Sequence, residues 1–199
     1  GTDTVATQIH VKAPEREQYH QSTMNAKSPA NKRQSAPTVF VVDDDEGVRD
    51  SLRFLLKSVG LATRTSGSAA EFLDSYDIDQ PGCLVLDVRM PAMSGLELQQ
   101  QLNVRGAMIP VIFITGHGDI PMAVEAMQHG AFDFLQKPFR DQDLIDRLQK
   151  ALAKDAENRT DLRQRDQIRA RFDTLTPREH EVLVLMVRGL PNKIMAAEL

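Results

Sequence analysis

The sequence of 199 residues has one cysteine, no tryptophan and no long apolar run. With Cys83 alone, no internal disulfide can form, which favours a reducing compartment. Spanning a bilayer takes about 20 consecutive apolar residues, and the N-terminal region lacks the apolar centre of a signal peptide. We therefore expect a cytoplasmic protein with no membrane partner.

Charge is distributed unevenly along the chain. The net charge is −4, and 41% of the residues are hydrophobic, which is sufficient for a folded core. The acidic excess lies in residues 38–139, whereas residues 140–199 are close to neutral. The acidic half suits a cation site, and the second half gives no strong electrostatic sign of nucleic-acid binding. Residues 1–37 are polar without periodicity, which predicts a flexible tail.

Strand-like and helix-like segments alternate between Thr38 and Leu152. Apolar runs predict strands near residues 38–43, 83–87, 110–115 and 131–136, and a weaker pattern predicts one near 61–66. Amphipathic segments with apolar residues at spacings of three and four lie between them. This alternation favours an α/β fold with a parallel sheet and helices on both of its faces. Continuous apolar strands agree, because they are typical of strands buried on both sides.

Polar side chains follow the ends of four of these strands. They are Asp43 and Asp44, Asp87, Thr115 and Lys137. In an open parallel sheet, ligands bind at the edge formed by the carboxyl ends of the strands. Carboxylate oxygens suit Mg²⁺, and a carboxylate beside such a cation can attack a phosphoryl donor. A hydroxyl and an ammonium group can bind the remaining phosphoryl oxygens.

Each of these residues also has an ordinary structural explanation. Adjacent acids often form a solvated turn, an aspartate at the end of a strand often caps a helix, and Lys137 before a proline can be a surface charge. The combination in this order is far more specific than its parts. If the carboxylates do gather, their like charges should raise the pKa of at least one of them.

Residues 38–152 resemble the receiver domain of two-component response regulators. The similar segments are Val41-Val42-Asp43-Asp44-Asp45, the run from Leu84 to Gly95, Ile114-Thr115-Gly116-His117-Gly118, and the run from Phe134 to Phe139. The resemblance implies a flavodoxin-like, five-stranded parallel sheet of strand order 2-1-3-4-5 with five helices.

The same resemblance implies roles for individual residues. Asp87 would be the phosphorylated residue, Thr115 and Lys137 would bind the phosphoryl group, and Phe134 would be the aromatic residue that moves with Thr115 in the switch. The peptide bond between Lys137 and Pro138 is expected to be cis. The implied Mg²⁺ ligands are Asp43, Asp44, Asp87 and the backbone carbonyl of Arg89.

The C-terminal part is predicted to be helical. Residues 153–173 are charged and lack glycine and proline, which indicates a solvated linker helix. Thr176, followed by Pro177 and by Glu179 at the third position, predicts a helix that starts with a capping box. Residues 174–199 resemble the start of the FixJ/NarL (LuxR-type) helix-turn-helix output domain, although a plain helical hairpin is the alternative. In that family the recognition helix comes later, so we expect no base-reading residue here, and Lys193 is at most a phosphate contact.

These features predict a phosphorylation-dependent transcriptional response regulator. It would catalyse only its own Mg²⁺-dependent phosphorylation and dephosphorylation and is not otherwise an enzyme. The expected partners are a sensor histidine kinase, promoter DNA for the full-length protein, and a second copy of the chain after phosphorylation. One alternative is a stand-alone receiver that acts through protein contacts. Another is a haloacid-dehalogenase-type phosphatase, although those enzymes carry a second aspartate two positions after a nucleophile on the first strand.

Overall fold

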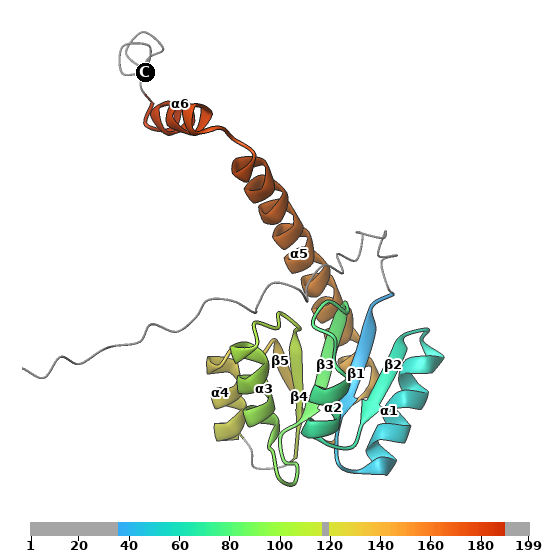
Figure 1. Ribbon diagram of the computed structural model, residues 1–199. Coiled ribbons are helices and arrows are strands. Elements are labelled where there is room, and N and C mark those ends of the chain that lie inside the picture. Colours follow the sequence, from blue (N-terminus) through green and yellow to red (C-terminus); the bar gives the residue numbers. More distant parts are fainter. Residues whose placement is uncertain (1–35, 117–119, 190–199) are drawn as a thin grey trace, which may run out of the picture. The chain divides into compact units, whose positions relative to one another are not determined.

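The computed structural model describes residues 36–116 and 120–189 (Figure 1). Its centre is a parallel sheet of five strands in the order β2-β1-β3-β4-β5. The strands are β1 (Thr38–Val42), β2 (Ala62–Ser66), β3 (Gly82–Asp87), β4 (Val111–Thr115) and β5 (Asp133–Gln136). The structure therefore confirms the predicted fold class and strand order.

Helices cover both faces of the sheet. The helices are α1 (Glu46–Ser58), α2 (Ala69–Ser75), α3 (Gly95–Val104), α4 (Ile120–Gln128), α5 (Asp141–Asp173) and α6 (Pro177–Val187). Residues of α1 to α5 pack on the sheet, and α6 follows α5 along the chain. Alternate residues of each strand point to opposite faces. Phe40 and Val42 accordingly pack with α2, α3 and α4 in one core, whereas Val39 and Val41 pack with α1 and α5 in the other.

Local capping fixes where several helices begin. Asp45 caps α1, and its side chain accepts hydrogen bonds from the backbone of Gly47 and Val48. A capping box joins Thr176 and Glu179 at the start of α6, as the sequence predicts. The expected second helix of the output segment, with Lys193, lies outside the described residues.

Helix α5 continues without a break through the predicted domain boundary at residue 152 and spans the whole predicted linker. Burial along this helix extends as far as Asp155, whereas residues 160–173 are all exposed. Its sequence is too polar for a membrane span, and no other helix within residues 36–116 and 120–189 is long and apolar enough to cross a membrane.

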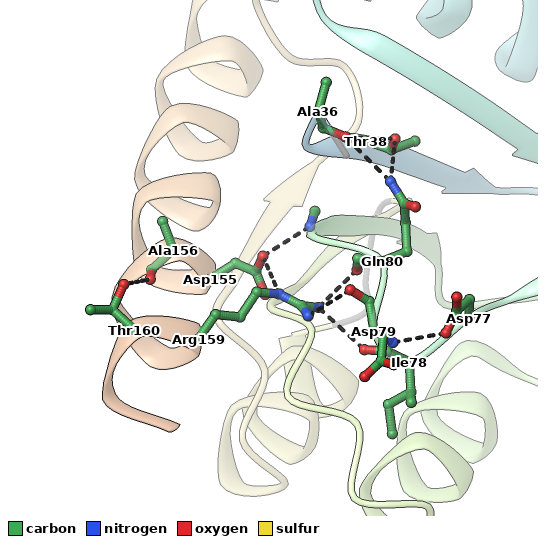
Figure 2. A network of polar contacts seen from close by, with 11 residues as sticks. Ala36, Thr38, Asp77, Ile78, Asp79, Gln80, Asp155, Ala156, Arg159 and Thr160 are labelled. Atoms are coloured by element: carbon green, nitrogen blue, oxygen red, sulfur yellow. Dashed lines mark hydrogen bonds and ion pairs between the residues drawn. The ribbon is translucent and has the colours of Figure 1, made fainter. Parts of the chain in front are cut away.

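An ion pair attaches α5 to the loop between α2 and β3 (Figure 2). Asp155 is buried and accepts a hydrogen bond of 2.9 Å from the backbone nitrogen of Gly82. The Nε atom of Arg159 lies 2.9 Å from Oδ2 of Asp155. The Arg159 guanidinium also donates to the carbonyl oxygens of Ile78, Asp79 and Gln80, at 3.3, 3.0 and 2.8 Å. This anchor lies at the start of β3, at the opposite end of the strand from Asp87.

Candidate functional site

The strand pairing brings the predicted polar residues to one edge of the sheet. Val42 of β1 pairs with Leu86 of β3, so Asp43 and Asp87 occupy neighbouring positions. On the next strands, Thr115 ends β4 beside Gln136 of β5, and Lys137 follows directly. Because all the strands are parallel, these carboxyl ends converge as expected for a ligand site.

Lys137 joins the two carboxylates. Its Nζ atom lies 3.1 Å from Oδ2 of Asp43 and 3.0 Å from Oδ1 of Asp87. The Asp43 and Asp87 side chains are only 4% and 13% exposed, so these bonds form with little competition from water. The ammonium group therefore compensates two carboxylates contributed by two different strands.

Backbone groups hold the remaining oxygens of the two carboxylates. The Asp45 nitrogen donates to Oδ1 of Asp43 at 2.9 Å, and the Arg89 nitrogen donates to Oδ2 of Asp87 at 2.7 Å. Each oxygen of the pair thus has a hydrogen-bond donor. The two side chains are held in defined orientations, which a reacting or cation-binding carboxylate needs.

The site changes the acidity of its own groups. Burial raises the pKa of Asp87, and the nearby charge of Asp43 adds to the rise, although Lys137 and the Arg89 nitrogen oppose it. Burial lowers the pKa of Lys137, but its hydrogen bonds and charge interactions with Asp87 and Asp43 outweigh that effect and raise it overall. The expected rise of a carboxyl pKa is present, but burial is its largest cause and like charge a smaller one.

The other predicted site residues differ in their surroundings. Asp44 is exposed, whereas Thr115 is buried and its hydroxyl donates to the Gly116 carbonyl at 3.4 Å. Within residues 36–116 and 120–189, no three carboxylate, imidazole or thiol groups come together as a metal-binding cluster. The structure thus brings Asp43, Asp87 and Lys137 together, and the full Mg²⁺ ligand set stays a prediction.

The loop after β3 packs back against the phosphoacceptor candidate. The Gly95 nitrogen donates to the Val88 carbonyl at 3.0 Å. A Cβ atom at Gly95 would lie 2.3 Å from the backbone oxygen of Asp87, so only glycine permits this close approach. The same loop contains Ala92 with a φ of 65°. The Lys137–Pro138 peptide bond is cis, as the resemblance implies.

Phe134 and Cys83 have different environments from the charged site. Phe134 is 39% exposed and helps to line a surface pocket with Val124 and Met127 of α4. Cys83 is fully buried in β3, and burial raises the pKa of its thiol to about 12. Cys83 therefore belongs to the core packing, as expected for a cysteine at the start of an apolar strand.

Arg49 is a further residue of the site that was not predicted from the sequence. This residue lies on α1, and its Nη1 atom donates to the Asp43 carbonyl at 2.7 Å. One indication was present in the sequence. Arg49 follows Asp43 by six positions, which places it near the start of α1, the helix that follows the acidic loop. Its partner is a backbone atom, however, and sequence patterns do not reveal such a bond.

Comparison with known proteins decides the family. The family description of the response regulator receiver domain matches residues 39–149. Nodulation protein W of Bradyrhizobium diazoefficiens is 52% identical over 161 residues, which cover 81% of this chain and 71% of that protein. The chain belongs to the response regulators of the FixJ/NarL type. The transcriptional regulatory protein FixJ of Azorhizobium caulinodans is 50% identical over 161 residues, which cover 81% of this response regulator and 76% of FixJ.

A solved structure agrees with this family. The response regulator StyR matches with a TM-score of 0.74 and 52% sequence identity, over 81% of this chain and 82% of StyR. The predicted family is confirmed, and so is the flavodoxin-like receiver fold. A phosphatase of the haloacid-dehalogenase type is thereby set aside.

Proposed function

We propose that this response regulator controls transcription through phosphorylation of Asp87 by a sensor histidine kinase. The observation that carries the proposal is the double ion pair of Lys137 with Asp43 and Asp87 at the carboxyl edge of the sheet. A cationic side chain shared by a buried and a partly buried carboxylate indicates a place where negative charge is compensated. A phosphoryl group on one carboxylate would need that compensation.

The transfer itself requires few protein groups. A carboxylate oxygen of Asp87 attacks the phosphorus of a phosphohistidine, and the bond from phosphorus to nitrogen breaks with its electron pair remaining on the imidazole. The Lys137 ammonium group, which pairs with the free Asp87 carboxylate, then pairs with the phosphoryl oxygens. Thr115 on β4 supplies a hydroxyl for a further phosphoryl oxygen. The reaction leaves the phosphoryl group on Asp87 of the response regulator itself.

Mg²⁺ is the cofactor that the donor set favours. Asp43 and Asp87 both have oxygens within hydrogen-bond distance of one ammonium nitrogen, so their carboxylates already converge on a cation. Asp43, Asp44, Asp87 and the Arg89 carbonyl would hold the metal, because a hard cation prefers oxygen ligands. When bound, Mg²⁺ would compensate charge on the phosphoryl oxygens.

The output step would use the face formed by α4 and β5. Val124, Met127 and Phe134 are 52%, 43% and 39% exposed there and together form an apolar patch. We propose that phosphorylation draws Thr115 toward the phosphoryl group and lets Phe134 move, which changes this patch and allows two copies to dimerise. Dimerisation would then present the output domains to promoter DNA.

The helical C-terminal part favours this function over a stand-alone receiver. Helix α5 continues beyond the receiver, and α6 begins with the predicted capping box. The relative FixJ is named a transcriptional regulatory protein. We propose a division into a receiver (38–152), a linker (153–173) and a partial helix-turn-helix region (174–199), in which the first turns of the linker are anchored to the receiver by Asp155 and Arg159.

Phosphorylation with acetyl phosphate and Mg²⁺ tests the proposal. The wild-type chain should accept one phosphoryl group, and Asp87→Asn should accept none. Asp50→Asn is a matched control, because Asp50 is an exposed carboxylate on α1 that pairs with Arg53, and it should be labelled normally. Normal labelling of the Asp87→Asn variant would overturn the assignment.

A further inference from the structure

We infer that Arg49 is a positioning residue for the cation site, and this inference rests on the function proposed above. Arg49 belongs to α1, and within residues 36–116 and 120–189 it makes no hydrogen bond or ion pair with Asp87 or Lys137. Its Nη1 atom donates a hydrogen bond of 2.7 Å to the backbone carbonyl of Asp43. Arg49 would thus act on the site through the backbone.

All the polar atoms of Asp43 are engaged. Its nitrogen donates to the Ser66 carbonyl at 3.3 Å, and its two carboxylate oxygens accept from the Asp45 nitrogen and from Lys137, at 2.9 and 3.1 Å. Arg49 holds the fourth atom, the carbonyl oxygen. The bond from Arg49 is the contact that fixes the peptide plane on the C-terminal side of Asp43.

That peptide plane also determines where Asp44 points. The carbonyl of Asp43 and the nitrogen of Asp44 share one rigid, planar unit. If the carbonyl oxygen is held, the position of the Asp44 nitrogen is held too, and only the remaining dihedrals of Asp44 stay adjustable. Asp44 is exposed and follows the last residue of β1 by two positions, so packing does little to orient it. Arg49 therefore orients both proposed carboxylate ligands of this loop without contacting either carboxylate.

The Arg49 guanidinium also lies close to Gly67. A Cβ atom built on Gly67 would lie 3.4 to 3.6 Å from the guanidinium atoms of Arg49, so this group stands beside the loop between β2 and α2. The Asp43 nitrogen already bonds to the Ser66 carbonyl just before that loop, so the guanidinium lies beside two chain segments that are held together.

Charge and positioning predict opposite effects of removing Arg49. A guanidinium near a cation site repels Mg²⁺, so charge alone predicts tighter Mg²⁺ binding in Arg49→Gln. If Arg49 orients the ligands, the same substitution weakens binding. Groups that orient metal ligands typically contribute about 10- to 100-fold to metal affinity. The sign of the change therefore separates the two roles.

The test is a Mg²⁺ titration of the full chain by calorimetry. Arg49→Gln should raise the Mg²⁺ Kd about tenfold. The matched control is Arg53→Gln, one turn further along α1, because Arg53 is an exposed cation that pairs with Asp50; its Kd should stay at the wild-type value. In acetyl phosphate labelling, Arg49→Gln should need more Mg²⁺ for half-maximal rate and approach the wild-type rate at saturating Mg²⁺. A residue needed only for folding would lower the rate at every Mg²⁺ concentration and would not raise only the Mg²⁺ requirement.

The outcomes are distinguishable. If the wild-type chain binds no Mg²⁺ and is not labelled, the proposed function fails. If the wild-type chain behaves as proposed but Arg49→Gln binds Mg²⁺ with equal or higher affinity, the positioning role is overturned and the proposed function stands. Should Arg49→Gln not fold, Arg49→Met decides, because it keeps an aliphatic side chain and removes the donor to the Asp43 carbonyl. Its Kd must rise about tenfold, and a wild-type Kd would overturn the inference.

Discussion

Asp155 and Arg159 form an ion pair on successive turns of α5, with Nε 2.9 Å from Oδ2, and the Asp155 side chain is only 2% exposed. The sequence places both residues in the predicted linker helix. In the structure Asp155 binds the first residue of β3 and Arg159 binds the loop before it, so both are anchored to the receiver (Figure 2). The exposed part of the linker therefore begins after Arg159 rather than at residue 153.

Removing Arg159 should destabilise the receiver. Arg159→Gln leaves the Asp155 carboxylate buried without its charged partner and leaves the backbone carbonyls of the α2–β3 loop with fewer donors. Breaking a buried pair in this way costs about 3 kcal/mol or more, so the urea midpoint should fall clearly. Arg163→Gln, one turn later and exposed, should change the free energy of unfolding by less than about 0.5 kcal/mol. Equal midpoints for the two variants would contradict the anchoring role.

Asp87→Asn should stabilise the protein at neutral pH. The pKa of Asp87 is raised in the folded state from its ordinary value of 3.8, so the folded protein binds this proton more tightly than the unfolded chain does. The stability contributed by Asp87 therefore falls as the pH rises from 3.8 through the raised folded pKa. The asparagine variant cannot ionise at this position and so does not lose this stability. It should have a higher Tm than the wild type at pH 7.

The difference in Tm should shrink as the pH is lowered. Below the ordinary pKa, the Asp87 carboxyl is protonated in both states of the wild-type protein, so both proteins should then respond alike to acid. Thermal unfolding followed by circular dichroism at several pH values measures this, with Asp50→Asn as the exposed control. A lower Tm of Asp87→Asn at pH 7 would show that the ion pair with Lys137 outweighs the burial of Asp87.

Ala92→Val should destabilise the loop after β3. Ala92 has a φ of 65°, a conformation that is strained for any residue with a Cβ and worst for β-branched residues. We expect a loss of about 1–2 kcal/mol in the free energy of unfolding, whereas Ala92→Gly should lose nothing. Ala62→Val is the control, because Ala62 is exposed in the extended strand β2, where valine is favourable. Equal stability of the two valine variants would refute the left-handed conformation at Ala92.

Met127→Glu should prevent phosphorylation-dependent dimerisation. Met127 is 43% exposed beside Phe134, and a carboxylate there would be desolvated in an interface. With Mg²⁺ and beryllofluoride, size-exclusion chromatography should give a dimer for the wild-type chain and a monomer for the variant. Val104→Glu places the same charge on α3, where Val104 is 89% exposed, and should still dimerise. A dimeric Met127→Glu variant would move the interface to another face.

Several parts of the fold could be predicted from residues that lie close together in the sequence. The apolar runs of β1, β3 and β4 made these strands predictable, because a strand buried on both sides needs a continuous apolar segment. The edge strand β2 is only partly buried and gave a weaker pattern. The capping box of Thr176 and Glu179 was also predictable, since both partners lie within one helical turn. Asp43, Asp87 and Lys137 could be predicted as site residues because strand ends of a parallel sheet share one edge.

Other parts depend on contacts between distant segments. Arg159 looks like an ordinary helical ion-pair partner in the sequence, yet it binds carbonyls about 80 residues earlier, including that of Asp79 at a separation of 80 positions. Arg49 binds a backbone oxygen, which carries no sequence signature. The raised pKa of Asp87 depends mainly on how deeply the folded protein buries it. None of these can be deduced from local pattern.

The sequence by itself determined the order of elements, their caps and the chemical groups at the carboxyl edge, because each depends on neighbours along the chain or on the direction of a strand. The tertiary structure decided which groups meet. Lys137 pairs with carboxylates 50 and 94 positions before it, and such pairs exist only once the sheet has brought separate strands side by side. Burial follows from the same assembly, so the acidity of Asp87 and the anchoring of α5 are properties of the folded protein.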